Sequence, residues 1–235
     1  MRSRLLLIPL VASAALLAGC NVLTPGPAPS PTPADNGVRQ LAAAEILGAA
    51  QDSLGDAESV RMSGTYTVLG VEAAVDLGFV GDDMEGTANV YGVGVEVVKI
   101  GTEVYVHAAL ELFAGFLPPE QAQQLADMTD KWFKVDVGLI SAVVPVPMSS
   151  DDLLDLLKPD GELVKGEPTM VNGEPAIVIT DAEGGELYVA TEGEPYPLKI
   201  VSENLSIEFE YDEEIEIEAP PAEDIVDLGE MFNLS

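Results

Sequence analysis

Residues 60–80 read VRMSGTYTVLGVEAAVDLGFV, a stretch in which apolar and polar side chains alternate. In its first half, Met62 and Tyr66 alternate with serine and threonine. In its second half, Val75 and Leu77 alternate with residues that include acidic ones. A period of two places all apolar side chains on one face of a strand. The stretch therefore predicts two strands, each with one buried face.

The same alternation continues along the chain. It predicts further strands over 86–91, 93–100, 103–108, 132–137, 163–171, 175–180, 186–191, 198–203, 206–211 and 214–218. Turn residues separate them: Asn172-Gly173 suits a tight hairpin, and Gly184-Gly185 permits positive φ. We therefore expect an antiparallel meander of about eleven strands.

Helical signals are fewer. We predict helices over 38–54, 111–128 and 149–157. Pro118-Pro119 interrupts the second segment, so its last helix should start near Pro119. Ser149 and Asp152 form a capping signal for the third. Strands before, between and after helices indicate an α+β fold, in which the space between sheet and helices either packs solid or stays open as an apolar cavity.

The first twenty residues, MRSRLLLIPLVASAALLAGC, have the order of a lipoprotein signal: basic residues, an apolar run over 5–17, and Leu17-Ala18-Gly19-Cys20. The apolar run is short for a span of ~30 Å of hydrocarbon. The match predicts that the Cys20 thiol takes a diacylglycerol and that the chain is cut before it. The alternative is an ordinary secretory signal. Cys20 is the only cysteine, so no disulfide can form within the chain.

This signal divides the chain into three parts. Residues 1–19 are the predicted signal peptide, 20–36 the acylated cysteine with a proline-rich tether, and 37–235 one folded domain. In the tether, prolines alternate with small residues, a composition that favours extended polyproline II. The predicted location is the cell membrane, with the domain lipid-anchored on the extracytoplasmic side.

Acidic residues dominate the charge. The chain has 41 Asp and Glu against 10 Lys and Arg, and loss of Arg2 and Arg4 with the signal leaves a formal charge of −33. Such a surface repels phosphates, which excludes nucleic acid as a partner and leaves the acyl anchor as the only attachment to the membrane.

Catalytic signals are absent from the sequence. The one histidine, His107, stands at a predicted strand end, and no nucleophile elbow, zinc motif or phosphate loop is present. The acidic run 212–218 lacks the ligand spacing of a calcium loop. Nothing selects a carboxylate pair for glycoside cleavage. We expect a protein that is not an enzyme and needs no metal or cofactor.

Two stretches near the C-terminus resemble known proteins. LYVATEGEPYPLKI (187–200) and EAPPAEDIVDL (218–228) are similar to the C-terminal signature of actinobacterial cell-envelope lipoproteins related to LppX and LprG. Residues 104–106 and 131–135 resemble the middle of the same proteins. The resemblance implies a LolA-like fold: a curved antiparallel sheet that forms an open half-barrel, with a few helices on its concave face. It also implies an apolar cavity for acylated lipids.

Together these features predict an envelope lipoprotein that binds, and transports or presents, a lipid or other apolar ligand. The residues expected to line the ligand space are Met62, Tyr66, Val75, Leu77 and Phe79, with Phe113 and Phe116 as an apolar lip. For the two lip residues, simple packing explains the sequence equally well. The alternative function is a packed sensor or scaffold of the same fold that acts through an envelope protein partner.

The anchor yields a prediction. Cys20→Ala should abolish acylation and block signal cleavage, because the thiol is the only acceptor. Membrane fractionation followed by mass spectrometry of the N-terminus measures both. A membrane-bound Cys20→Ala protein that is still cut before residue 20 would contradict the assignment.

Overall fold

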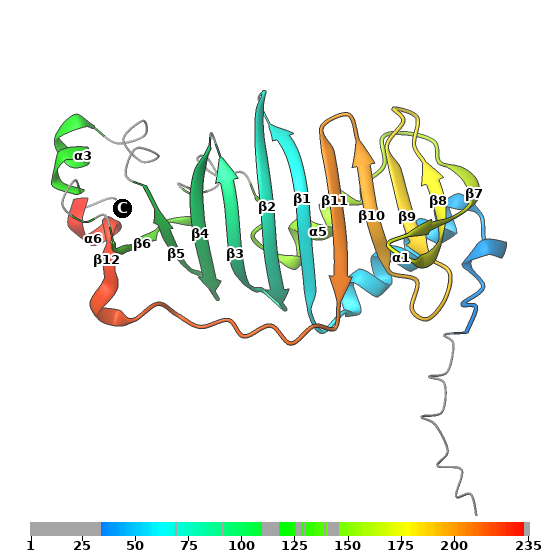
Figure 1. Cartoon of the computed structure of the whole chain (residues 1–235), viewed down its shortest axis with the longest axis horizontal. Helices are drawn as coiled ribbons and strands as arrows, with labels where there is room; N and C mark the ends of the chain where they lie inside the picture. Colours follow the sequence, from blue (N-terminus) through cyan, green and yellow to red (C-terminus); the bar gives the residue numbers. More distant parts are fainter. Residues whose placement is uncertain are drawn as a thin grey trace, which may run out of the picture. The chain divides into compact units, whose positions relative to one another are not determined.

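A twelve-stranded sheet forms the framework of the chain in the computed structural model (Figure 1). The structure describes residues 34–68, 70–90, 92–109, 118–125, 128, 130–138, 140 and 146–232. The strands are β1 (Val60–Val68), β2 (Val71–Val80), β3 (Asp83–Val90), β4 (Val93–Ile100), β5 (Glu103–Ala108), β6 (Trp132–Val135), β7 (Val164–Val171), β8 (Glu174–Thr180), β9 (Glu186–Ala190), β10 (Pro197–Ser202), β11 (Leu205–Tyr211) and β12 (Ile225–Asp227). The predicted α+β class with a large, mainly antiparallel sheet is confirmed.

The sheet consists of two meanders. Its order is β12-β6-β5-β4-β3-β2-β1-β11-β10-β9-β8-β7, so β1 to β6 are neighbours in sequence order, and so are β7 to β11. The meanders join where β1 pairs antiparallel with β11, with Met62 opposite Phe209 and Tyr66 opposite Leu205. Only the pairing of β12 with β6 is parallel among the described strands.

One glycine permits the two meanders to approach closely. Gly64 in β1 has φ +147°, and a Cβ built on it would lie 2.0 Å from the backbone oxygen of Ser206 in β11. Only a residue without a Cβ fits there. The junction between the meanders therefore depends on Gly64.

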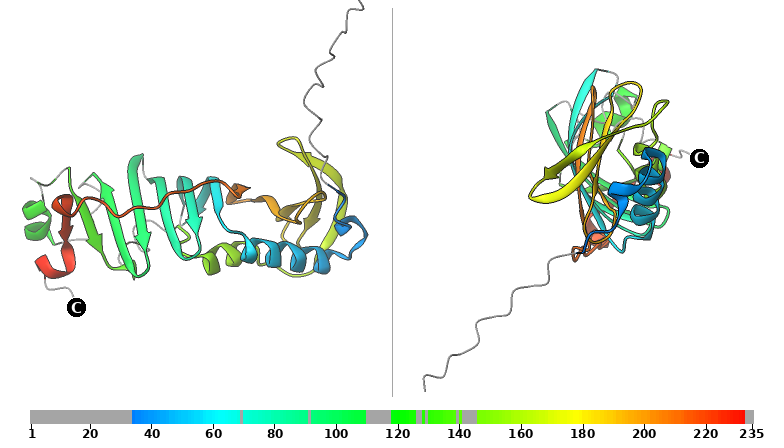
Figure 2. Two further views of the ribbon diagram at one scale, coloured as in Figure 1. Left: turned by 90° about the horizontal axis from the view of Figure 1, so that it is seen from below. Right: turned by 90° about the vertical axis from the view of Figure 1, so that its right-hand side faces the viewer.

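Helices cover one face of the sheet. Helix α1 (Ala43–Asp56) and helix α5 (Ser150–Leu156) lie on the same side, and α1 contacts α5, β8 and β10 (Figure 2). The core lies between them and the sheet. It includes Ile46, Ala50 and Leu54 of α1 and the alternating apolar residues of β1 and β2 that the sequence predicted to be buried. Shorter elements are η1 (Val38–Gln40), α3 (Pro119–Leu125), η2 (Ala222–Asp224) and α6 (Leu228–Phe232).

Two helix starts follow from capping. The predicted helix over 38–54 is divided: Leu41 is extended, and α1 starts after Ala42, whose backbone N–H donates to Glu45 Oε2 at 2.9 Å. Helix α5 starts as predicted, since Ser149 Oγ accepts from the backbone N–H of Asp152. No helix among the described residues has the length and hydropathy to cross a membrane.

The predicted strand over 214–218 was wrong. These residues belong to the crossing segment, residues 212–221, which runs along the strand ends from β11 to β12 (Figure 1). The strands that it passes already have partners on both sides, so it cannot enter the ladder. Instead Ile215 packs on the sheet, where a Cβ on Gly78 would lie 3.1 Å from two of its side-chain carbons.

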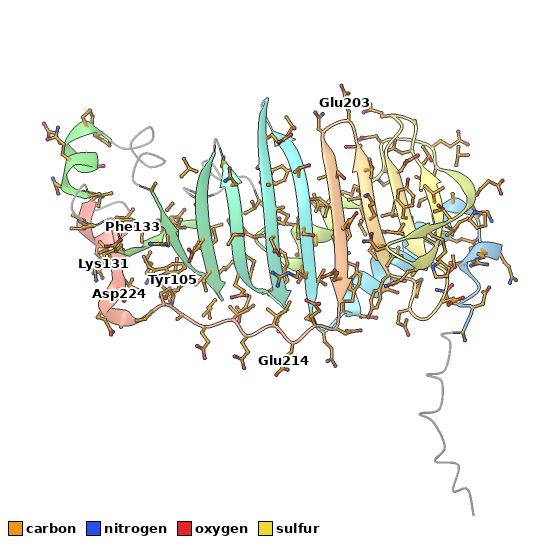
Figure 3. All side chains as sticks on the ribbon, in the orientation of Figure 1. Tyr105, Lys131, Phe133, Glu203, Glu214 and Asp224 are labelled. Carbon is orange, nitrogen blue, oxygen red and sulfur yellow. The ribbon has the colours of Figure 1, made fainter. Side chains whose placement is uncertain are left out.

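The crossing segment ends in a strand that the sequence analysis did not predict. Strand β12 pairs with β6, and Lys131 Nζ lies 2.7 Å from Asp224 Oδ1 beside this pair (Figure 3). Glu214 lies on the crossing segment in the same view and is exposed. At the other end of the chain, Asn36 N donates to Thr191 O at 3.1 Å, so the last residue assigned to the tether contacts the sheet.

Gly64 gives a stability prediction. Gly64→Ala should lower the free energy of unfolding by about 1–3 kcal/mol, because the new methyl group requires a strained backbone and displaces β11. The matched control is Gly94→Ala in β4, where a Cβ meets open space. Urea denaturation measures both variants. Equal stabilities for the two would contradict the importance of the close approach.

Candidate functional site

An open apolar cleft of about 640 Å³ lies on the helix-covered face, at the end of β1 next to the turn between β10 and β11. Five described parts of the chain line it: β1, this turn with the start of β11, Val137 after β6, the segment before α5, and helix α5 itself. The described lining residues are Met62, Tyr66, Thr67, Val137, Val146, Pro147, Met148, Asp152, Asp155, Leu156, Asn204 and Leu205. Its volume is in the range of small-molecule sites, and most of its lining is apolar.

Alternation of apolar and polar residues along β1 determines which of its side chains form one wall of the cleft. Met62 and Tyr66 share the buried face of β1, and their exposed fractions are 1% and 8%. Thr67 N donates to Asn204 O at 2.7 Å, which ties the end of β1 to the β10–β11 turn. Leu205 stands opposite Tyr66 across the junction. Two segments far apart in sequence thus form one wall.

The opposite wall is held by the cap of α5. While Ser149 Oγ accepts from Asp152 N, Asp152 Oδ2 accepts from Met148 N at 2.8 Å. Ser150 Oγ also donates to the backbone oxygen of Gly81 at 2.6 Å, so the start of α5 is attached to the β2–β3 turn. These bonds fix Met148 and the first turn of α5 at the cleft.

Tyr66 carries the unusual polar group of the site. Its hydroxyl oxygen is buried and has no hydrogen-bond partner among the described residues, although buried hydroxyls normally have one. Burial raises the pKa of Tyr66 well above its usual value. The group is therefore a neutral O–H donor at physiological pH.

The charges at the cleft are acidic. Asp152 and Asp155 are among its lining residues, and none of the described lining residues is Lys or Arg. Asp155 pairs with Lys158 one turn later, with 2.5 Å between Oδ1 and Nζ. The lining therefore offers no free cation to an anionic group.

A smaller cavity of about 190 Å³ adjoins the cleft under α1 and the end of α5. Leu156 and Leu205 line both spaces, so these two side chains separate them. The other apolar residues of the smaller cavity include Leu47, Leu163, Ile179, Leu187 and Ile200. Charged residues also line the smaller cavity, among them Lys158, Asp160 and Asp181, so it is more polar than the cleft.

The predicted ligand residues divide into three groups. Met62 and Tyr66 line the cleft, whereas Val75, Leu77 and Phe79 lie in the buried core and are not among its lining residues. Phe113 and Phe116 lie outside the described residues. No motif in the sequence marks Met148, Asn204 or Leu205 as ligand residues, because only the folded chain brings them close to Tyr66.

A larger hollow of about 790 Å³ has a different character. Its lining is mostly carboxylates and small or aromatic residues: Ala49, Asp52, Ser53, Asp56, Glu58, Glu194, Pro195, Tyr196 and Asp212. Among the residues that the structure describes, no group of three or more His, Cys, Asp or Glu is arranged to hold a metal ion. We therefore regard the apolar cleft as the candidate site.

His107 lies away from the cleft lining. Its ring centroid is 5.5 Å from that of Trp132, and its Nδ1 is 3.6 Å from Glu96 Oε1. The ring is thus held between an aromatic side chain and a carboxylate on neighbouring strands, which is an arrangement of packing and surface charge.

Comparison with known proteins gives structural matches only. No family model and no curated protein matches the sequence. The crystal structure of LprF from Mycobacterium bovis matches 81% of this chain and 99% of its own, with 12% sequence identity and a TM-score of 0.49. An uncharacterized conserved protein from Thermus thermophilus matches 79% of this chain and 98% of its own, with 12% identity and a TM-score of 0.39. Both matches are likenesses between structures at low sequence identity.

Proposed function

We propose that this protein is a membrane-anchored envelope lipoprotein that binds an acyl lipid or a similar apolar ligand in the cleft beside Tyr66. The observation that carries the proposal is the cleft of about 640 Å³ with its mainly apolar lining. A smaller cavity of about 190 Å³, with a mixed polar and apolar lining, adjoins the cleft at Leu156 and Leu205. Binding and carriage need no reaction, and we propose that the protein is not an enzyme.

Desolvation supplies the affinity in this proposal. Burial of ~400 Å² of acyl chain at ~25 cal/mol per Å² gains ~10 kcal/mol before the costs of association. Polar contacts then contribute orientation and selectivity. The cleft needs few such groups, and the Tyr66 hydroxyl is one.

The anchor and the charge support a location at a membrane surface. An acylated Cys20 would hold the chain by its N-terminus, while the acidic domain would be repelled by anionic head groups. The domain would therefore exchange ligands with the membrane through brief encounters. Carriage or presentation of a lipid across the envelope is consistent with this arrangement.

Copurified lipid tests the proposal. The chain from Asn21 onward, made without its signal in a bacterial host, should retain acyl lipids through purification. Solvent extraction and mass spectrometry identify them. A folded chain that contains no lipid and takes up none from vesicles would favour the sensor or scaffold function through a protein partner.

Two tryptophan substitutions distinguish the cleft from the core. Leu205→Trp fills the boundary between the two spaces and should expel most of the lipid with little loss of stability. Leu77→Trp is the control in the solid core, where Leu77 is fully buried and a Cβ on Gly86 would lie 3.0 Å from its Cδ2. The control should cost about 1–3 kcal/mol of unfolding free energy through overpacking. Full lipid content in Leu205→Trp would contradict the proposed site.

A further inference from the structure

We propose that Tyr66 selects the ligand: its hydroxyl donates a hydrogen bond to an ester or hydroxyl oxygen of an uncharged acyl compound, while Asp152 and Asp155 disfavour an anionic head group. This inference rests on the proposed function and names the ligand class of the same cleft. It has two independent parts, an unpaired donor and a one-sided charge.

The unpaired donor comes from the position of Tyr66. Only 8% of the Tyr66 surface is exposed, and the residue lines the cleft. No described residue forms a hydrogen bond with its hydroxyl. A buried hydroxyl without a partner is destabilising relative to a paired one. An oxygen acceptor on the ligand would remove that cost in the complex. A pure hydrocarbon would not.

Other tyrosines in the chain show the contrast. The hydroxyl of Tyr105 donates to Glu103 at 2.9 Å, that of Tyr188 to Glu186 at 2.6 Å, and that of Tyr211 to the backbone oxygen of Pro197 at 2.6 Å. Each of these three groups is satisfied within the protein. The Tyr66 hydroxyl differs from these three, because no described residue accepts its hydrogen bond.

The charge decides which acceptor fits. A phosphate or carboxylate would accept the same hydrogen bond, but it would enter a cleft that is lined by two carboxylates. Lys158, the cation beside the cleft on the same helix end, is paired with Asp155. Both carboxylates are exposed, so the repulsion acts at the rim of the cleft and weakens as the salt concentration rises. An uncharged ester or alcohol supplies the acceptor without that repulsion.

Photo-crosslinking tests the inference on the full chain in its host membrane. Three probes share one acyl or alkyl chain with a diazirine and a terminal alkyne: a 1-palmitoylglycerol, a palmitic acid and a hexadecane. After irradiation, labelling is quantified on the protein and mapped to the tryptic peptide that follows Lys134 and ends at Lys165, since Pro159 blocks cleavage after Lys158; this peptide carries Met148 and Leu156. The wild type should be labelled more by the glycerol ester than by the acid.

Tyr66→Phe is the decisive variant. Labelling by the glycerol ester should fall about 3- to 10-fold, as expected for loss of one hydrogen bond, while labelling by the hexadecane probe stays unchanged. Tyr105→Phe is the matched control and should change neither. Because the Tyr66 hydroxyl has no partner among the described residues, Tyr66→Phe should leave the melting temperature unchanged or raise it, whereas a structural tyrosine would lower it.

The outcomes separate this inference from the proposed function. If no probe labels the cleft peptide of the wild type, the proposed function fails. If all three probes label it equally, or Tyr66→Phe is labelled like the wild type, the cleft binds apolar chains but Tyr66 does not select them. Stronger labelling by the acid than by the ester would overturn the charge argument.

Discussion

The pairing of β1 with β11 is the constraint on which the rest of this structure depends. It joins two local meanders whose strands are otherwise sequence neighbours, and it links residues about 140 positions apart. Gly64 makes the close approach feasible, since a side chain there would collide with the backbone of Ser206. The same pairing sets Tyr66 opposite Leu205, so the wall of the apolar cleft is a direct product of this long-range contact.

The described residues fill the buried face of the sheet only in part. Around Leu77 and Phe79 the core is solid, with side chains that have almost no exposed surface. At the end of β1 the described part of the cover consists of the seven-residue helix α5, residues 146–148 before it and Val137. A short helix covers little area on a sheet of twelve strands, and the space that remains is apolar because its walls continue the core pattern.

In the proposed function, the charge distribution gives the molecule two separate relations to lipids. The acidic surface would keep the domain from adhering to anionic head groups, so attachment to a membrane would be left to an acylated N-terminus. Inside the cleft, hydrophobic burial would hold an acyl chain, and the neutral Tyr66 hydroxyl would recognise an oxygen on it. In this scheme, anchoring and ligand recognition use different parts of the chain.

Local patterns in the sequence determined most of the strands, the buried face of residues 60–80 and the cap at Ser149, because each depends on residues close together in the chain. The tertiary structure alone decided that residues 214–218 cross the sheet without joining it and that residues 225–227 form its last strand. It also decided that Tyr66 lines an open cleft while Leu77, on the same face, lies in solid core. These outcomes depend on which distant segments of the chain meet. Alternation of apolar and polar residues determines which face of a strand is buried, but it does not determine which segment covers that face.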